Sequence, residues 1–243
     1  MKLTDSHIVI TGGASGLGLV LVEHLQAHNK IGVIARPSRG LDALRQRHQD
    51  IEIYEADLAD LASVELAADA LVKRGVKIDI LINNAAVQHT PKFIDDDFRY
   101  ETIRREIDIN FTSICALTYL LMPLLLKETR SNIVNINSGL ALVPKTSSAV
   151  YCATKGALNI FSKSLAHQLE ETNISVNQAF LPLVDTGMPQ GRGGVKLPAD
   201  QVAQQIISGI ADNKAEINIG KVKLLRVIQR LSPTIATKIM KAA

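Results

Sequence analysis

The sequence predicts a single-domain α/β fold, a doubly wound parallel sheet with helices on both faces. Short runs rich in β-branched residues alternate with longer segments of helical periodicity along the 243-residue chain. Several short runs, such as 78–82 and 133–136, are apolar with little strict alternation, as expected of strands covered on both faces. A glycine-rich turn joins the first run to the first helical segment.

Seven strands are predicted, separated by segments of helical or turn character. They lie at residues 7–11, 31–35, 51–54, 78–82, 132–137, 175–180 and 216–219. The first helix is expected over residues 17–25. The longest apolar run, 116–126, contains Pro123 and falls short of the roughly 18 to 20 residues that span a bilayer, so we expect a buried helix there.

Composition favours one globular domain. With 47% hydrophobic and 21% charged residues the chain can bury a substantial core. We find no repeat, linker or low-complexity stretch that would mark a second domain, and residues 187–197 form the only loose segment. We therefore assign residues 1–220 to the main domain and residues 221–243 to a basic amphipathic helical tail packed on it.

The N-terminus and the cysteines favour a cytoplasmic protein without a metal site. Polar residues follow the first three positions at once, so the basic and apolar parts of a secretory signal are missing. Cys115 and Cys152 stand alone in apolar surroundings, which favours reduced, buried thiols over a disulfide or a metal pair. The histidines show no HExxH pattern.

The glycine-rich turn has the sequence TGGASGLG and ends at Gly18. Glycine lets the main chain approach a pyrophosphate closely, and the N-terminus of the following helix stabilises its charge. A tight strand-to-helix turn can also need glycine for structural reasons alone, and the GxxxGxG spacing differs from GxGxxG. The strand before the turn and the helix after it favour a Rossmann-type dinucleotide site, with the candidate residues Gly12, Ser15, Gly16, Leu17 and Gly18.

Further positions are expected to contact a dinucleotide. Arg36 stands eighteen residues after Gly18, where an NAD-dependent enzyme usually carries an acid. A guanidinium there suits a 2′-phosphate, so we favour NADP(H) over NAD(H); the alternative is that Arg36 belongs to a solvated loop. Asp57, Leu58 and Asn84 follow the third and fourth strands, at the sheet edge where ligands of open α/β sheets bind.

A serine and a tyrosine–lysine pair follow the fifth strand. Ser138 lies just after this strand, and Tyr151 and Lys155 begin the next helix four residues apart. Residues at this spacing share a helix face, so the ammonium can lie near the phenol. Lowering a tyrosine pKa from about 10 to about 7 needs about 4 kcal/mol of preferential stabilisation of the phenolate, which a close cation and a positively charged nicotinamide ring can supply.

The motifs TGxxxGxG, NNAx and YxxxK, together with Asn110 and Ser138, resemble those of the short-chain dehydrogenase/reductase family in order and spacing over nearly the whole chain. The resemblance implies hydride transfer between a nicotinamide dinucleotide and a carbonyl or alcohol, with a proton relay in the protein. Tyr151 would exchange a proton with the reacting oxygen, and Ser138 would hydrogen-bond to it. Lys155 would lower the tyrosine pKa and hold the nicotinamide ribose, and Asn110 would order a water.

The chain departs from the family pattern at three positions. Ala86 stands where a glycine is usual, and Asn137 where many members have a serine. Leu183 replaces the glycine of a Pro-Gly pair and removes a permissive backbone position beside the nicotinamide. Val184 and Thr186 still fit the pattern that contacts the carboxamide. The runs VYCATK and LVDT are similar to those of a bacterial subgroup associated with D-alanine esterification operons.

The tail is basic and amphipathic. The net charge of +3 divides into −3 over residues 1–216 and +6 over residues 217–243, which hold no acid. Apolar residues recur at helical spacing, at Leu224, Leu225, Ile228 and Leu231, and Ser232 with Pro233 is expected to begin another helix. Contact with an anionic membrane is one interpretation, but we favour packing on the body or on another subunit.

A small-molecule carbonyl or alcohol is the expected substrate, and a homodimer or homotetramer the expected assembly. The apolar helices around 111–126 and 153–169 are the usual subunit interfaces of the family that the chain resembles.

No nucleic acid is expected, because the basic residues lack interleaved aromatics. Arg192 and Lys196 are better explained as solvated charges than as substrate contacts. The main alternative to an active enzyme is a catalytically weak dinucleotide-sensing or regulatory protein.

Overall fold

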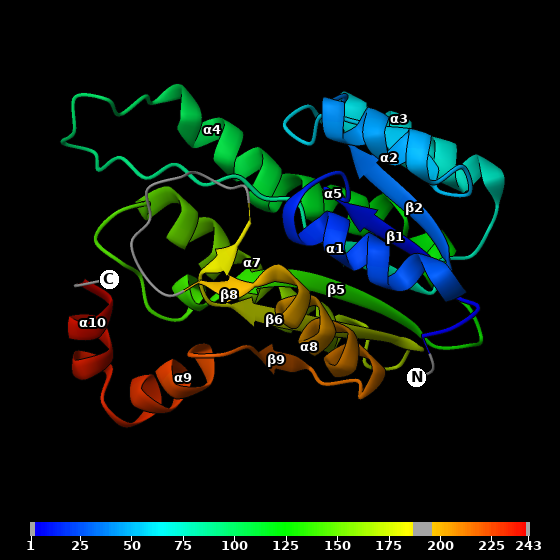
Figure 1. Ribbon diagram of the computed structural model, residues 1–243. Coiled ribbons are helices and arrows are strands. Elements are labelled where there is room, and N and C mark those ends of the chain that lie inside the picture. The colour runs from blue at the N-terminus through cyan, green and yellow to red at the C-terminus, as the bar shows by residue number, and fades with distance from the viewer. Residues whose placement is uncertain (1–2, 187–195, 242–243) are drawn as a thin grey trace.

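The computed structural model describes residues 3–186 and 196–241, which form a seven-stranded parallel sheet between helices (Figure 1). The strands, in the order in which they lie in the sheet, are β3 Glu52–Glu55, β2 Lys30–Ala35, β1 His7–Thr11, β4 Ile80–Asn83, β5 Ser131–Ser138, β6 Ile174–Leu181 and β9 Glu216–Asn218. A separate parallel pair consists of β7 Val184–Asp185 and β8 Leu197–Pro198. The predicted doubly wound α/β fold is therefore confirmed.

Helices cover the sheet in two layers. One layer contains α1 Gly16–Leu25, α2 Arg39–Arg47 and α8 Ala199–Ala211, and the other contains α3 Leu61–Arg74, α5 Ser113–Leu120 and α7 Ala149–Gln168. The remaining helices of the described chain are η1 Gln26–His28, α4 Glu101–Ile107, η2 Asp108–Thr112, α6 Met122–Leu125, η3 Gly139–Ala141, α9 Val222–Leu231 and α10 Pro233–Lys241.

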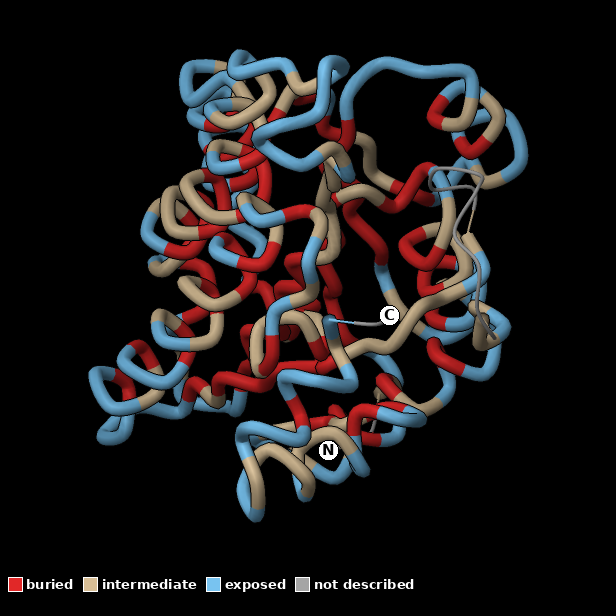
Figure 2. The backbone as a smooth tube through the Cα atoms, turned by 90° about the vertical axis from the view of Figure 1, so that its left-hand side faces the viewer, coloured by how far each residue is buried: buried red, intermediate tan, exposed pale blue. Residues whose placement is uncertain are grey.

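Alternate residues of the central strand β1 face the two layers. Ile8 and Ile10 pack with the layer of α1, α2 and α8, whereas Val9 packs with the layer of α3, α5 and α7. All three are fully buried, and burying a side chain of this kind contributes roughly 1.5 to 3 kcal/mol. Figure 2 shows the buried stretches of the backbone in red, running through the interior of the molecule. Because both faces are covered, interior strands such as β1 and β4 need no polar face, which explains their apolar runs at residues 8–10 and 80–82.

The predicted strands agree with the structure to within two residues, but the helix expected over 116–126 is interrupted. The helix α5 ends at Leu120 and α6 begins at Met122. Pro123 lies in the first turn of α6, where its missing N–H costs no helical hydrogen bond, whereas it could not have continued α5. Among the described residues, no helix is long and apolar enough to cross a membrane.

The C-terminal tail forms two helices, and the second begins at Pro233 as expected. Of the four apolar residues expected to pack, Leu225 and Ile228 are half-buried, whereas Leu224 and Leu231 are exposed. The difference arises because α9 faces the body through Val222, which is buried and lies about half a helical turn away from Leu224 and Leu231.

Amide side chains connect the sheet to α7. Asn83 of β4 donates to Asn135 Oδ1 of β5 at 2.8 Å, and Asn135 donates in turn to Ser162 Oγ of α7 at 2.8 Å. All three residues are buried, so breaking one link would leave an unsatisfied polar group in the core. This network fixes α7, which carries Tyr151 and Lys155, against β5.

The direction of strand addition reverses at β1. The chain adds β2 and β3 on one side of β1 and then β4, β5 and β6 on the other. Loops from the carboxyl ends of β1 and β4 therefore diverge at this point, which is where ligands bind in open α/β sheets. The glycine-rich turn follows β1, Asn84 follows β4, and Ser138 ends β5 at the same edge.

Candidate active site

The glycine-rich turn leads from the carboxyl end of β1 into α1. Gly12 has a φ of +70° and Gly16 a φ of +55°, left-handed conformations that glycine adopts without steric cost. A Cβ atom on Gly18 would lie 2.2 Å from the Gly12 carbonyl oxygen, so this close approach requires glycine. Ser15 is the N-cap of α1 without a side-chain capping bond, and Leu17 is buried. The turn thus brings open backbone to a helix N-terminus, as a phosphate site requires.

Thr11 and Asn84 join this turn to the loop after β4. The Thr11 hydroxyl oxygen accepts hydrogen bonds from the backbone N–H groups of Asn84 at 2.9 Å and Ala85 at 3.0 Å. The Asn84 side chain donates to the Thr11 carbonyl oxygen at 3.0 Å and to that of Gly12 at 3.4 Å. Asn84 therefore lies at the turn, as predicted, with its amide bound to the protein's own backbone.

The first turn of α2 packs against the glycine-rich turn. A Cβ atom on Gly40 would lie 2.5 Å from the Ala14 carbonyl oxygen, so glycine is needed at this contact. Ser38 caps α2, its hydroxyl accepting from the Leu41 N–H at 3.2 Å. Arg36 lies on the segment that joins β2 to α2, and its side chain is exposed. The guanidinium is therefore carried by a segment anchored beside the turn.

Asp57 follows β3 and pairs with Arg105 of α4. Arg105 Nη2 lies 3.2 Å from Asp57 Oδ2, and Asp57 Oδ1 accepts from the Ala59 N–H at 3.0 Å. Partial burial opposes ionisation, but the hydrogen bond from Ala59 and the charges of Arg105 and Arg36 together lower the pKa of Asp57. Arg36 therefore contributes to the electrostatic environment of Asp57. The neighbouring Leu58 is buried.

Tyr151 and Lys155 lie in the first two turns of α7, at the carboxyl end of β5. Lys155 Nζ is 5.8 Å from the centroid of the Tyr151 ring and donates to the Ile136 carbonyl oxygen at 2.8 Å. Lys155 is only 2% exposed, and this burial lowers its pKa to about 8. Ser138 lies two residues beyond Ile136, and its hydroxyl accepts from the Leu140 N–H at 3.1 Å. The structure thus places the three predicted residues at one end of β5.

Asn110 lies in the π-helical turn η2 between α4 and α5. Its Oδ1 accepts from the Val87 N–H at 2.8 Å, and its Nδ2 donates to the Val87 carbonyl oxygen at 2.8 Å and to Thr154 Oγ1 at 3.2 Å. Thr154 immediately precedes Lys155, so Asn110 connects the loop after β4 to the start of α7. Single π turns of this kind are frequent at functional sites.

A buried carboxyl group lies one turn before Asn110. Glu106 is 1% exposed, and its Oε1 accepts from the His89 N–H at 3.1 Å. Burial raises the pKa of Glu106 to about 7, although the hydrogen bond from His89 opposes the shift. Glu106 was not predicted as a site residue, because a glutamate among the charges of ETIRREID is typical of a solvated helix face.

The segment after β6 returns to the glycine-rich turn. A Cβ atom on Gly16 would lie 3.3 Å from Thr186 Cβ, so Thr186 lies beside the start of α1. Val184 begins β7. The backbone φ angle of Leu183 is not positive. The chain therefore passes this position without the left-handed conformation that a glycine would permit. The departure from the family pattern at Leu183 is therefore accommodated by an ordinary backbone conformation.

The loose segment predicted over 187–197 is described only in part. Residues 187–195, and with them Arg192, lie outside the described residues. Lys196 Nζ lies 3.6 Å from Asp185 Oδ1, which gives this lysine a partner within the protein.

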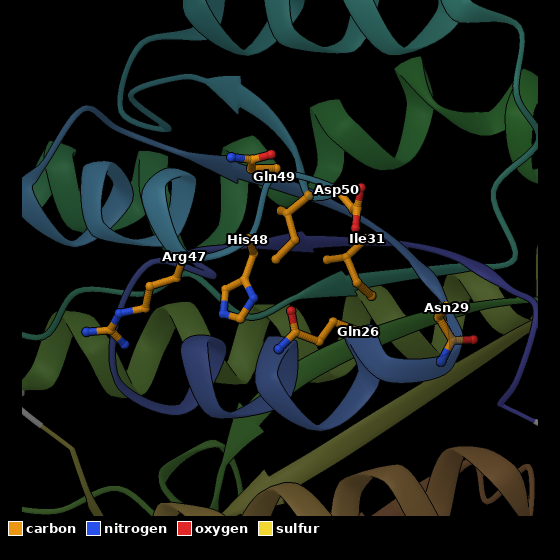
Figure 3. A pocket seen from close by; sticks show the side chains of 8 residues that line it. Gln26, Asn29, Ile31, Arg47, His48, Gln49 and Asp50 are labelled. Carbon is orange, nitrogen blue, oxygen red and sulfur yellow. The ribbon is translucent and has the colours of Figure 1, made fainter.

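A surface hollow lies at the opposite edge of the sheet (Figure 3). It is lined by Gln26, Asn29, Ile31, Arg47, His48, Gln49, Asp50 and Ile51, near the amino ends of β2 and β3. Dinucleotides bind at the carboxyl edge of such sheets, so this hollow is separate from the candidate site.

Three further residues near the candidate site were not predicted from the sequence. Thr11 is the last residue of the first predicted strand. A hydroxyl at this position could have suggested a hydrogen bond to the loop that follows the neighbouring strand β4. Gly40 follows the N-cap of α2, which could have suggested a close backbone contact. Arg105 gave no local indication, because its partner Asp57 lies 48 residues away in the chain.

A parallel sheet with a glycine-rich turn and a tyrosine–lysine pair at its carboxyl edge is the architecture of dinucleotide-binding dehydrogenases. The family model for short chain dehydrogenases matches residues 6–193. This chain belongs to that family of oxidoreductases, as its motifs indicated.

Individual relatives agree with this assignment. The chain is 32% identical over 233 residues to the uncharacterized oxidoreductase DltE of Bacillus subtilis, a match covering 93% of this chain and 92% of that one. A short chain dehydrogenase from Burkholderia cenocepacia in complex with NADP has a TM-score of 0.88 at 20% identity, over 99% of both chains. A Burkholderia phymatum enzyme of the family in complex with NAD has a TM-score of 0.81 at 20% identity, over 95% of this chain and 96% of that one.

Proposed function

We propose that this protein transfers a hydride between a nicotinamide dinucleotide and a carbonyl or secondary alcohol group of a small molecule. The observation that carries the proposal is the burial of Lys155 beside Tyr151, at the end of the strand that carries Ser138. Among the described residues Lys155 has a carbonyl partner but no carboxylate. Burying an ammonium without a counter-charge destabilises a fold, so a catalytic role explains its presence better than a structural one.

The geometry of the turn fits a dinucleotide. The left-handed Gly12 and Gly16 and the close approach at Gly18 leave the backbone at the start of α1 open, in a cradle that side chains would fill. Ser15 and Leu17 belong to the same turn. Further positions proposed to border the bound molecule are Asp57, Leu58, Asn84, Val184 and Thr186. When bound, the dinucleotide supplies or accepts the hydride.

The chain's own residues move the proton. The Tyr151 phenol donates a proton to the substrate oxygen in reduction and accepts one in oxidation, while the Ser138 hydroxyl holds the same oxygen by a hydrogen bond. The Lys155 ammonium stabilises the phenolate electrostatically, in a site where burial strengthens the interaction. Asn110, whose side chain is fixed by Val87 and Thr154, positions a water that links Lys155 to solvent.

We propose a preference for NADP(H). Arg36 is exposed beside the glycine-rich turn and influences Asp57 electrostatically. A planar guanidinium in this position matches a 2′-phosphate, and the N-terminus of α2 adds a favourable field for an anion. The related structures bind NADP in one case and NAD in another, so the proposed preference for NADP(H) rests on Arg36 and not on the fold.

We also propose a homo-oligomer. Tyr119 of α5 is 79% exposed and Ile160 of α7 is 66% exposed, on the two helices from which a subunit interface was expected. Light scattering on the purified protein measures the number of subunits. A single mass equal to that of the monomer over the micromolar range would contradict this assembly.

Consumption of NADPH and NADH by the purified protein in the presence of aldehydes, ketones and quinones tests the proposal. We expect turnover of at least one substrate class with NADPH, and a loss of at least about 100-fold in Ser138→Ala. Cofactor binding without turnover of any compound would instead favour a sensing or regulatory role. The two cofactors are first titrated against the protein, so that failure to bind is distinguished from failure to react.

A further inference from the structure

The tail helix α9 uses one face to pack on the body. A Cβ atom on Gly139 would lie 3.2 Å from Cγ2 of the buried Val222, so the helix rests on η3, directly after Ser138. Gln229 Nε2 donates to the Leu142 carbonyl oxygen at 2.8 Å, which ties the same face to the end of η3. The face of α9 that carries Val222 and Gln229 therefore packs on the domain.

The outer face of α9 and α10 carries large apolar side chains in solvent. Leu224, Val227 and Leu231 are 62%, 53% and 80% exposed. Their spacing of three and then four residues places them in one row along α9. Ile235 and Ile239, four residues apart on α10, are 53% and 47% exposed. Contiguous exposed apolar groups of this kind mark interaction surfaces.

Basic residues border this apolar row, and most of them form no ion pair within the described part of the chain. Five basic residues of the tail are exposed and form no ion pair with any described residue: Lys221, Lys223, Arg230, Lys238 and Lys241. Arg226 alone is paired, with Glu216, which is the last acid of the sequence. The outer surface thus combines unpaired positive charge with apolar groups. Such a surface repels the same surface of a second copy and attracts an anionic one.

We propose that the exposed face of α9 and α10 docks on an anionic lipid surface. The two helices would lie in the plane of the interface, with Leu224, Val227 and Leu231 among the headgroups and the lysines and arginines facing lipid phosphates. In Figure 1 these helices lie at one corner of the molecule, on the far side from α2 and α3. Because the inner face of α9 rests on η3, docking would place the end of β5 one helix away from the lipid surface.

Co-sedimentation with vesicles tests the docking. The full-length protein is mixed with vesicles of phosphatidylcholine alone or of phosphatidylcholine with an equal part of phosphatidylglycerol. We expect binding only to the anionic vesicles, at least about tenfold above the neutral ones, and its loss at about 1 M salt, where the Debye length falls to about 3 Å.

Two double variants separate the apolar and the charged contributions. Leu224→Ser with Leu231→Ser removes exposed apolar groups, and Lys223→Glu with Arg230→Glu reverses two charges. All four side chains are exposed and have no ion-pair partner in the described chain, so the fold is expected to remain intact by circular dichroism. We expect each double variant to lower the vesicle partition coefficient at least about tenfold.

Matched controls are available on α2 and α3. Leu61→Ser with Leu66→Ser removes apolar groups that are 43% and 72% exposed, and Arg47→Glu with Lys73→Glu reverses two exposed charges. Both controls are expected to bind anionic vesicles within about twofold of the wild type, because their sites lie away from the tail.

Three results would overturn the proposal. The first is a failure of the wild-type protein to bind anionic vesicles, and the second is equal binding to neutral ones. The third is a change in molecular mass by light scattering when Leu224 and Leu231 are replaced, because it would assign the surface to a second copy of the chain. None of these measurements depends on catalysis, so the docking and the proposed reaction can fail separately.

Discussion

The Lys155 ammonium donates a hydrogen bond to the Ile136 carbonyl oxygen at 2.8 Å, which holds the start of α7 against the end of β5. Ser138 lies two residues further along this strand, so the same contact sets the position of Tyr151 relative to Ser138. The ammonium is buried, and its pKa falls to about 8 because water no longer solvates the charge. Several consequences of this arrangement can be measured.

Replacing Lys155 by methionine is expected to stabilise the protein at pH 7. The pKa of Lys155 is about 8 in the folded protein against 10.5 for the free side chain, so the folded state binds fewer protons between these values. Wild-type stability therefore rises as the pH increases through this window. The pKa difference corresponds to about 3 kcal/mol, which is the upper limit of the gain expected for Lys155→Met at pH 7. Urea denaturation should show the gain shrinking toward pH 10; a less stable variant at pH 7 would refute the argument.

Glu106 is expected to give the opposite pH dependence. Its pKa is about 7 in the folded protein against 4.5 for the free side chain, so the folded state binds more protons between these values and stability falls as the pH rises through them. Glu106→Gln keeps an acceptor for the His89 N–H without the charge. We expect it to match the wild type near pH 4.5 and to be more stable by up to about 3 kcal/mol at pH 8.

Glu101 provides the control for this experiment. It lies on the same helix, α4, but is exposed. Glu101→Gln is expected to change the free energy of unfolding by less than about 0.5 kcal/mol at either pH. A difference between Glu106→Gln and wild type that does not vary with pH would contradict the assignment of a buried ionisable carboxyl group.

Gly18→Ala is expected to abolish cofactor binding. The added Cβ atom would lie 2.2 Å from the Gly12 carbonyl oxygen and 2.5 Å from Asn84 Nδ2, so the turn must open. We expect the Kd for NADPH to rise at least about 100-fold, since several backbone contacts are lost together. Gly156→Ala is the control, because its Cβ atom meets nothing within 4 Å; it should stabilise α7 by about 0.5 to 1 kcal/mol without weakening binding. An unchanged Kd in Gly18→Ala, by fluorescence titration, would show that the turn does not hold the cofactor.

Arg36→Ala is expected to reduce the selectivity for NADPH. A charge-assisted hydrogen bond to a phosphate contributes about 1.5 to 3 kcal/mol, so the Kd for NADPH should rise about 10- to 100-fold while that for NADH stays within about twofold. Arg47→Ala, at the exposed far end of α2, should affect neither constant. If the wild type binds NADH more tightly, or if Arg36→Ala weakens both cofactors equally, the role given to Arg36 is wrong.

Most of the fold could be predicted because its determinants are local. A strand buried on both faces, such as β4, appears in the sequence as a short apolar run. The turn after β1 is recognisable by its glycines. The break between α5 and α6 was not predicted, because the long apolar run over residues 116–126 favours one helix, although Pro123 also carries local information. The exposure of Leu224 and Leu231 depends on which face of α9 meets the body, and periodicity alone does not determine this.

The candidate site was predictable where sheet topology brings motifs together. Ser138 is the last residue of β5, and the pair Tyr151 and Lys155 lies in the first two turns of α7. The end of this strand and the start of this helix lie at the same edge of the sheet. Glu106 and Arg105 were missed because their environment comes from distant segments. The first receives a hydrogen bond from His89 and the second pairs with Asp57, and neither partner can be inferred from spacing.

Steady-state turnover of Tyr151→Phe tests the central claim most directly. The variant keeps the ring and removes only the hydroxyl, so the Kd for NADPH should stay within about threefold of the wild type while kcat for the preferred carbonyl substrate falls at least about 1000-fold. That combination is the result expected if Tyr151 is the proton donor at the reacting oxygen. Turnover within about tenfold of the wild type would contradict the proposed mechanism.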